Sequence, residues 1–293
     1  MPVNGLLVLD KPSGMTSHDV VSIVRRATGE QSIGHLGTLD PLATGVLPLL
    51  LGRYTRLAQF FSRAEKEYTG TIRFGFATDS FDADGTPVGE TVALRKSFEE
   101  LQVLAGTFHG EIDQLPPIFS AKKLGGVPAH KLARAGLPAP VKAARITIHD
   151  FRLTGLEGEV ASFAITVSAG GYVRSVAQEL GQLAGCGAHL ASLRRTRAGV
   201  FTLAQAITVD QLKDAAGDQA FAGLLPHPRT LLTEIPAVTV DEQLAGRLRN
   251  GMQVNLPEYT NAPLVRVFAS PTELIAIARR VAGTLMQPHV VIG

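Results

Sequence analysis

The chain has 293 residues, and its 28 basic and 26 acidic residues give a formal net charge of +2. Hydrophobic residues at 45% and charged residues at 18% are typical of a folded globular protein and exclude disorder, collagen-like repeats and coiled coil. The single cysteine excludes an internal disulfide framework and a Cys-rich zinc site, and it favours the reducing cytoplasm. No uncharged stretch reaches the roughly 18 residues of a spanning helix, so we expect no membrane association.

The periodicity of apolar residues and the turn signals between them predict alternating strands and helices. In chain order we expect a strand at 5–10, a helix at 17–26, a strand at 68–76, a helix at 97–106, a strand pair at 146–153 and 160–167, and helices at 172–184 and 208–216. Between the expected helix at 17–26 and the expected strand at 68–76, residues 34–52 are rich in Gly and Pro and nearly free of charge. After a Pro-punctuated linker at 225–236, short strands with Gly and Pro turns predict a small β-rich domain.

Charge is segregated along the chain. Residues 76–113 carry eight acidic and two basic residues, a net charge of −6. Residues 122–152 carry seven basic residues and one acidic residue, a net charge of +6, and they overlap an inserted excursion at about 114–144 that has prolines near its ends. Such a basic segment on a nearly neutral protein is typical of a polyanion-binding face, and solvated surface charge is the alternative interpretation.

Two glycine-containing stretches hold the candidate reactive residues. Residues 34–48 contain Asp40, the only acidic residue between Glu30 and Glu65, in an apolar setting. A buried carboxylate needs a cationic partner, which makes Asp40 a functional candidate, although an Asp that caps the turn before Pro41 would look the same. Arg174, which follows two glycines at a predicted helix start, could supply that partner.

Other chemistries have weaker support. Cys186 and His189 suggest a cysteine nucleophile, but on a Gly-rich turn they need not face each other, and a buried small cysteine is the simpler interpretation. The eight histidines are scattered without metal-ligand spacing, and no phosphate-binding Gly-rich motif is present, so we expect no metal and no cofactor. The loop that begins at Asp79 lacks the distal ligands of a calcium loop.

Five motifs, in order, together resemble the TruB family of bacterial tRNA pseudouridine synthases. They lie at residues 5–17, 34–48, 68–85, 114–123 and 185–195. The resemblance implies an α+β fold: a pseudouridine-synthase catalytic domain at 1–233, with a mixed, mainly antiparallel sheet, flanking helices and an RNA-binding insertion. It also implies a compact PUA-like domain at 234–293.

The same resemblance implies a role for each matching residue. Asp40 matches the catalytic aspartate, Arg174 the arginine that pairs with it, and Tyr68 the tyrosine that stacks on the target base and is a candidate for proton abstraction. The expected substrate-binding residues are, besides Tyr68, Lys11, His35, Tyr172 and Leu193, and the expected RNA contacts of the insertion are Lys122, Lys123, Lys131 and Arg134.

The implied reaction converts uridine 55 of the tRNA T loop to pseudouridine after base flipping, without a cofactor. The implied partner is tRNA, held at its T arm by the insertion and at its acceptor stem by the C-terminal domain, with the acidic segment turned away from the RNA. We expect a monomer. A non-catalytic module that opens and refolds the T loop is the alternative role.

Overall fold

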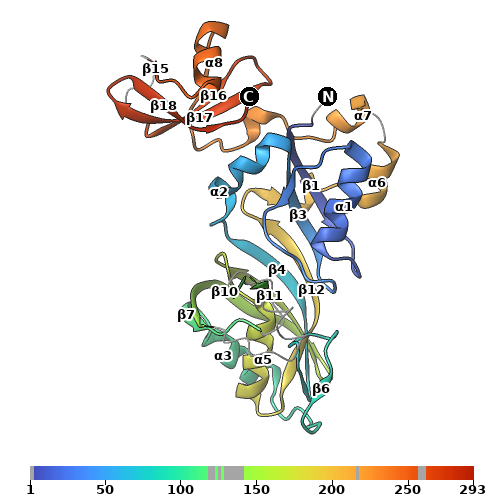
Figure 1. Cartoon of the computed structure of the whole chain (residues 1–293). Helices are drawn as coiled ribbons and strands as arrows, with labels where there is room; N and C mark the ends of the chain where they lie inside the picture. Colours follow the sequence, from blue (N-terminus) through green and yellow to red (C-terminus); the bar gives the residue numbers. More distant parts are fainter. Residues whose placement is uncertain (1–2, 118–122, 125–126, 129–141, 216–217, 257–261) are drawn as a thin grey trace.

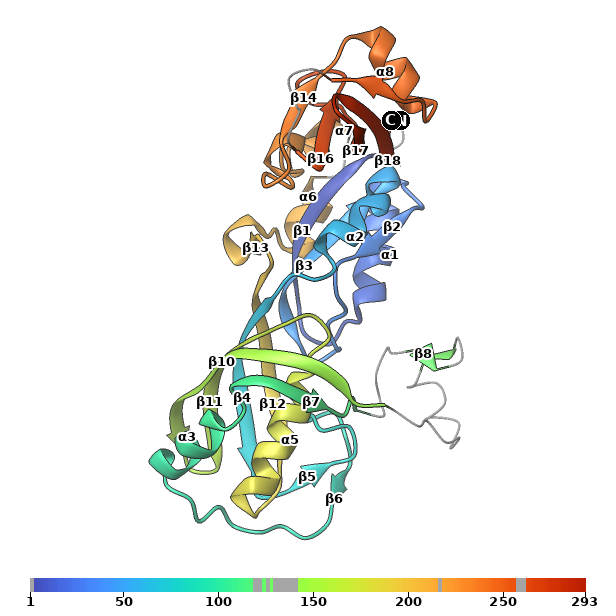
Figure 2. The same ribbon diagram turned by 90° about the vertical axis from the view of Figure 1, so that its left-hand side faces the viewer.

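The computed structural model describes residues 3–117, 123–124, 127–128, 142–215, 218–256 and 262–293. The molecule is elongated and contains two principal β-sheets, with a five-stranded sheet at one end and helices α3 and α5 at the other (Figures 1 and 2). No helix in these ranges is long and apolar enough to cross a bilayer.

The larger sheet has nine strands and forms the frame of the site. Its main path runs β1-β3-β12-β4-β11-β10-β7, with β2 added to β3 and β13 added to β12. All neighbours are antiparallel except β3 and β12. The strands are β1 (Gly5–Lys11), β2 (Ile33–His35), β3 (Thr44–Leu51), β4 (Lys66–Phe74), β7 (Gly110–Gln114), β10 (Ala144–Glu157), β11 (Val160–Val167), β12 (Ala188–Ala198) and β13 (Phe201–Thr202).

Four helices pack their apolar sides on one face of this sheet and share one hydrophobic core with it. They are α1 (Ser17–Thr28), α3 (Phe98–Gly106), α5 (Val173–Ala184) and α6 (Val209–Asp214). Three of them begin after a side-chain cap, since the hydroxyls of Thr16, Ser97 and Thr208 each accept a hydrogen bond from the backbone N–H three residues on. The left-handed Gly29 and Gly185 end α1 and α5.

The smaller sheet follows the order β14-β16-β17-β18-β15 and packs α8 (Glu242–Arg249) against it. Its strands are β14 (Ala237–Thr239), β15 (Val254–Asn255), β16 (Leu264–Phe268), β17 (Leu274–Ala282) and β18 (Leu285–Val291). A second apolar cluster joins the two sheets: residues of β1 and β3, together with Tyr54 and Phe61, meet Phe268 and Ile277. Residues of η1 (Gly52–Leu57) and α2 (Ala58–Phe61) belong to this cluster. The small sheet therefore packs directly against the large sheet.

The remaining described elements are short. They are the pairs β5 (Ala77–Thr78) with β6 (Pro87–Val88) and β8 (Lys123–Leu124) with β9 (Val127–Pro128), then η2 (Leu203–Gln205), α7 (Asp218–Ala222) and η3 (Pro228–Thr230). In Figure 2, β8 lies beyond the ends of β7 and β10, away from the sheet.

Every strand and helix predicted from periodicity is present, with boundaries that differ by a few residues. The main omissions are β12, an 11-residue strand, and β3, which lies within the Gly- and Pro-rich stretch 34–52. Proline lacks an amide donor and is normally confined to sheet edges, yet Pro48 lies in this central strand opposite Val8. Its carbonyl accepts a hydrogen bond from Leu36 N at 2.9 Å. Because seven of the eight residues of β3 are buried, the strand shows no alternation of polar and apolar positions.

Candidate active site

A cavity of about 550 Å³ lies between the loop before β3, strands β4 and β12, and the start of α5. Its lining includes most of the residues that the sequence singled out as reactive or base-contacting. They are Asp40, Tyr68, Tyr172, Arg174 and Leu193. They come from four separate segments of the chain, which the large sheet brings together.

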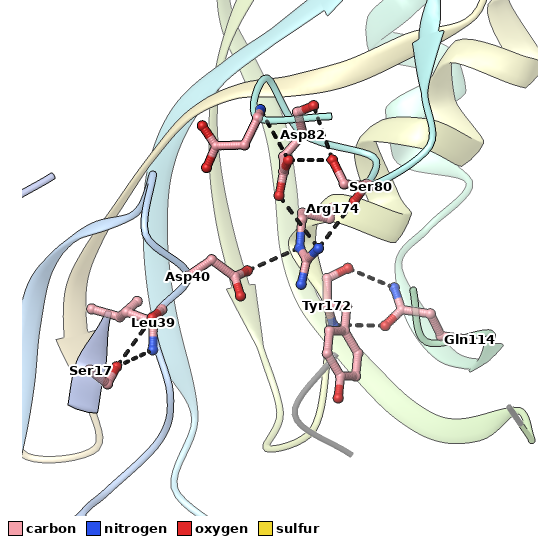
Figure 3. A network of polar contacts seen from close by, with 9 residues as sticks. Ser17, Leu39, Asp40, Ser80, Asp82, Gln114, Tyr172 and Arg174 are labelled. Carbon is pink, nitrogen blue, oxygen red and sulfur yellow. Dashed lines mark hydrogen bonds and ion pairs between the residues drawn. The ribbon is translucent and has the colours of Figure 1, made fainter. Parts of the chain in front are cut away.

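Asp40 lies on a loop whose backbone is held by hydrogen bonds to two buried side chains, Ser17 and Arg195. The buried Ser17 hydroxyl accepts a hydrogen bond from Leu39 N at 2.9 Å and donates to Leu39 O at 3.1 Å. The guanidinium of Arg195 donates to Gly37 O at 3.0 Å and to Val46 O at 2.7 Å. The loop therefore presents the Asp40 carboxylate to the cavity without depending on the carboxylate itself for its shape (Figure 3).

Arg174 forms the expected ion pair with Asp40, with 3.0 Å between Nε and Oδ2. The Arg174 side chain is only 5% exposed and lies in the first turn of α5. A cation at this end is unfavourable to the helix dipole, and its burial costs further free energy. The arrangement is stable because acceptors surround the guanidinium, and a position this unfavourable to the helix makes Arg174 a candidate functional residue.

Sequence reasoning missed the second carboxylate of this site, Asp82. Its Oδ2 lies 3.4 Å from Arg174 Nη1, and the Ser80 carbonyl accepts from the same nitrogen at 3.1 Å. Asp82 is 4% exposed, and the hydroxyl of Ser80 donates to its Oδ1 at 2.5 Å. Asp82 therefore belongs to the site, although it lies in the acidic segment 76–113 that we expect to be turned away from the RNA. Because the exposed Asp79 and Asp84 are its acidic neighbours, the net charge of the segment did not distinguish the buried Asp82 from them.

The loop that carries Asp82 is clamped to β12. Backbone hydrogen bonds run from Ala83 N to Leu190 O and from Leu190 N to Phe81 O, each at 2.9 Å. Phe81 adopts a left-handed backbone conformation (φ 67°), which is costly for a residue with a large side chain. This geometry turns Asp82 inward, so that Arg174 lies between two carboxylates.

Two opposing effects act on the Asp40 carboxyl. Desolvation by the surrounding protein raises the pKa of Asp40 above its usual value, and the charge of Arg174 opposes this rise. The second carboxylate, Asp82, raises it further. Arg174 is thus the strongest of the groups that favour the ionised form of Asp40.

Aromatic and apolar side chains form the rest of the cavity wall. Tyr68 of β4 and Leu193 of β12 are both 8% exposed and line the cavity. Tyr172 is the N-cap residue of α5, and the Gln114 side chain fixes its backbone by accepting from Tyr172 N at 2.8 Å and donating to Tyr172 O at 3.0 Å. The wall can therefore hold a planar, largely apolar group beside the Asp40 carboxylate.

Two expected substrate-binding residues lie outside the cavity lining. Lys11 is fully buried, and its ammonium donates to the carbonyls of Pro12, Met15 and Pro41 at 2.9, 2.6 and 3.3 Å. Burial lowers the pKa of Lys11 to about 8. Lys11 therefore lies outside the cavity, where we expected a substrate contact, and its ammonium instead holds the backbone of the Asp40 loop at Pro41. His35 lies in β2, edge-on to His18 with 5.9 Å between ring centroids.

The expected RNA contacts of the insertion can be placed only in part. Lys122, Lys131 and Arg134 lie outside the described residues, and Lys123 belongs to β8. At the alternative thiol site Cys186 is buried, and Nδ1 of His189 hydrogen-bonds with the Phe76 carbonyl at 3.1 Å. Within the described ranges, no three His, Cys, Asp or Glu side chains cluster as a metal site would require.

Comparisons with known proteins show which family the chain resembles over most of its length. Residues 25–173 match the family model for the TruB family pseudouridylate synthase N-terminal domain, and residues 174–226 match the tRNA pseudouridylate synthase B C-terminal domain. The tRNA pseudouridine synthase B of Solibacter usitatus is 41% identical over 292 residues, which cover 99% of this chain and 100% of the relative. That of Symbiobacterium thermophilum is 44% identical over 253 residues, covering 85% and 83%.

The fold also matches a solved structure. The archaeal box H/ACA sRNP Nop10-Cbf5 complex contains a chain with a TM-score of 0.68 at 23% identity, over 99% of this chain and 86% of that chain. At this identity the match concerns the fold, and it covers both sheets.

Proposed function

The chain belongs to the TruB family of pseudouridylate synthases and is a tRNA pseudouridine synthase, and we propose that its target is uridine 55 of the T loop. The observation that carries the proposal is the Asp40–Arg174 pair at the wall of a cavity that also presents Tyr68 and Leu193. A uracil base that enters this cavity meets an ionisable carboxylate and an aromatic side chain together.

The reaction dictates what the site must supply. The N1–C1′ glycosidic bond of uridine breaks, the uracil turns, and a C5–C1′ bond forms; the C5 proton is lost and N1 gains a proton. All other atoms remain and no electrons are exchanged with a second molecule, so the reaction requires no cofactor. The protein must extract the base, assist bond cleavage with a carboxylate and remove the C5 proton.

Base extraction is the first requirement. A T-loop uridine is stacked and must be flipped into the cavity at a cost of roughly a few kcal/mol. Stacking on Tyr68 offsets about 1–3 kcal/mol of that cost. Leu193 and Tyr172 exclude water from the base once it has entered.

Asp40 then acts on the flipped nucleoside. A carboxylate can attack C1′, attack C6 or assist formation of a glycal, and all three routes require its ionised form. Arg174 favours that form and fixes its direction, while Asp82 and the Ser80 carbonyl hold Arg174 from the other side. Tyr68 is the candidate base for the C5 proton, because it lines the same cavity.

The remaining assignments concern the rest of the tRNA. We propose that the chain divides into a catalytic domain at 1–233 and a PUA-like domain at 234–293, and that the insertion at 114–144, with Lys122, Lys123, Lys131 and Arg134, binds the T arm. The second domain then meets the acceptor stem. The monomeric protein acts in the cytoplasm, where its tRNA substrate is found.

Mapping of the product tests the proposal directly. An unmodified tRNA transcript is incubated with the purified full chain, and pseudouridine is located by carbodiimide labelling and primer extension. We expect a single site at the T-loop uridine. A product at another position would overturn the assignment of the substrate, and modification of free uridine would overturn the need for a structured loop.

A further inference from the structure

Besides the Asp40–Arg174 pair, here called the Arg174 end, the cavity lining holds a second charged group, here called the Arg195 end. Lys66, the first residue of β4, and Arg195 of β12 both line the cavity at Gly37. A Cβ on Gly37 would lie 3.4 Å from Arg195 Nη1 and 3.8 Å from Lys66 Cε. Gly37 has φ 116°, so only glycine allows the loop backbone to approach both cations without strain.

Neither cation forms an ion pair within the described part of the chain. Lys66 Nζ donates to the carbonyl of Ala64 at 2.7 Å, and Arg195 donates through Nε and Nη2 to the carbonyls of Val46 and Gly37. The acidic neighbours are engaged elsewhere: Glu67 pairs with Arg197 at 2.7 Å, and Glu65 pairs with His149 at 3.1 Å.

The positive charge here is strong enough to affect its surroundings. Burial lowers the pKa of Lys66, and the Arg195 guanidinium adds to the decrease. Arg195 has the same secondary effect on Lys11 and on His35. A largely buried group of cations without carboxylates is costly unless an anion joins it. The anion available to a cavity that receives a nucleotide is a backbone phosphate.

The geometry points to a phosphate subsite formed by Lys66 Nζ and Arg195 Nη1, which binds a backbone phosphate adjacent to the nucleotide whose base stacks on Tyr68. Lys66 and Tyr68 project from the same face of β4 two residues apart, about 7 Å along the strand. The base and its backbone therefore meet adjacent side chains of one strand. This inference rests on the proposed function, because it assumes a flipped nucleotide in the cavity.

Salt dependence of binding provides the first test. All variants carry Asp40→Asn to prevent turnover, and the affinity for a T-arm stem-loop RNA is measured across a series of NaCl concentrations. Lys66→Gln should weaken binding about tenfold and reduce the slope of log K against log [salt] by about 0.7–0.9, the value for one lost phosphate contact. Lys66→Arg keeps the charge and should restore the slope.

Lys96→Gln is the matched control, since Lys96 lies outside the cavity and pairs with Glu100 at 3.0 Å. It should leave both affinity and slope unchanged. An unchanged slope in Lys66→Gln, with circular dichroism that reports an intact fold, would overturn the subsite.

A neutral methylphosphonate placed 5′ or 3′ of the target uridine identifies the phosphate. One of the two positions should weaken binding by the protein with Lys66 intact about tenfold, and should weaken binding by Lys66→Gln clearly less, because one of the two cation contacts is already lost. Additive losses at both positions would contradict the proposal. Pseudouridine formation on the unsubstituted RNA by the protein with Asp40 intact is followed separately, so failure of the proposed function is recognised independently of these binding results.

Discussion

The two ends of the cavity both hold a buried arginine, and they differ in what surrounds it. Arg174 lies between Asp40 and Asp82, so its charge is matched by carboxylates. Arg195 donates to two backbone carbonyls, and its neighbour Lys66 to a third, so their charges remain unmatched among the described residues. The first end is suited to hold an ionised carboxylate for chemistry, and the second to attract a polyanion.

This contrast explains why net charge is a poor guide to the site. The formal charge of +2 reflects sums over whole segments, whereas binding and chemistry depend on which individual charges face the cavity. Asp82 belongs to the most acidic segment of the chain, yet it faces inward and neutralises Arg174. Arg195, in contrast, is almost fully buried and still leaves its charge uncompensated.

Removal of the carboxylate at the Arg174 end should have the largest effect. Asp40→Asn keeps the shape of the side chain but cannot supply a negative charge, so we expect pseudouridine formation to fall at least about 10³-fold. tRNA affinity, measured by filter binding, should change less than about threefold. Asp113→Asn, which removes an exposed carboxylate paired with Arg145, is the control and should retain full activity. Turnover by Asp40→Asn would remove the basis for a catalytic Asp40.

The second carboxylate should matter less, because it acts through Arg174. Asp82→Asn loses one of the acceptors that orient the guanidinium, and we expect kcat to fall about 10–100-fold with little change in KM. Asp79→Asn is the matched control from the same loop, where the Asp79 carboxylate accepts from Thr86 N at 2.9 Å. Equal losses in both variants would mean that the fold of the loop, rather than the charge of Asp82, supports catalysis.

A pH profile tests the electrostatic role of Arg174. Burial raises the pKa of Asp40, and Arg174 opposes the rise, so loss of the arginine charge should raise the pKa further. Activity requires ionised Asp40 and falls as pH decreases through that pKa. The acidic limb of the residual kcat/KM in Arg174→Gln should therefore move to higher pH. Arg145→Gln, an exposed change, should leave the limb in place; an unshifted limb in Arg174→Gln would contradict the role.

The parts of the fold that sequence predicted are those set by local signals. Thr16, Ser97 and Thr208 begin helices because a hydroxyl three residues before a free backbone N–H suffices to cap it, whatever lies beyond. β3 was missed because its stability comes from neighbours on both sides, which override the unfavourable local signals of Gly45 and Pro48.

The same distinction applies to the site. Asp40 and Arg174 could be identified as candidate site residues from the sequence, because an isolated charge in an apolar or Gly-rich context is unusual in itself. Asp82 lies among other acidic turn residues, and only the backbone bonds of its loop to β12 reveal its direction. Lys11 lies in the first motif, at 5–17, and its ammonium donates to three backbone carbonyls, which no local pattern indicates.

The smallest expected effect concerns His35, near the Arg195 end. Burial lowers the pKa of His35, and the charges of His18 and Arg195 add to the decrease. Nδ1 of His35 is buried and has no hydrogen-bond partner among the described residues. In the unfolded chain the imidazole regains its usual pKa of about 6.5 and binds a proton more readily than in the folded protein. Stability should therefore decrease as pH falls below about 6.5 and be fully present above it.

His35→Gln should flatten this part of the pH dependence, by at most about 1.4 kcal/mol per pH unit, the limit for one proton. The measurement is the free energy of unfolding by urea at intervals from pH 7.5 to 5. His109→Gln, at an exposed turn, controls for loss of an imidazole as such. If the two variants flatten the curve equally, His35 is not held neutral by its surroundings. If only His35→Gln does so, burial and the neighbouring charges keep the His35 imidazole neutral in the folded protein.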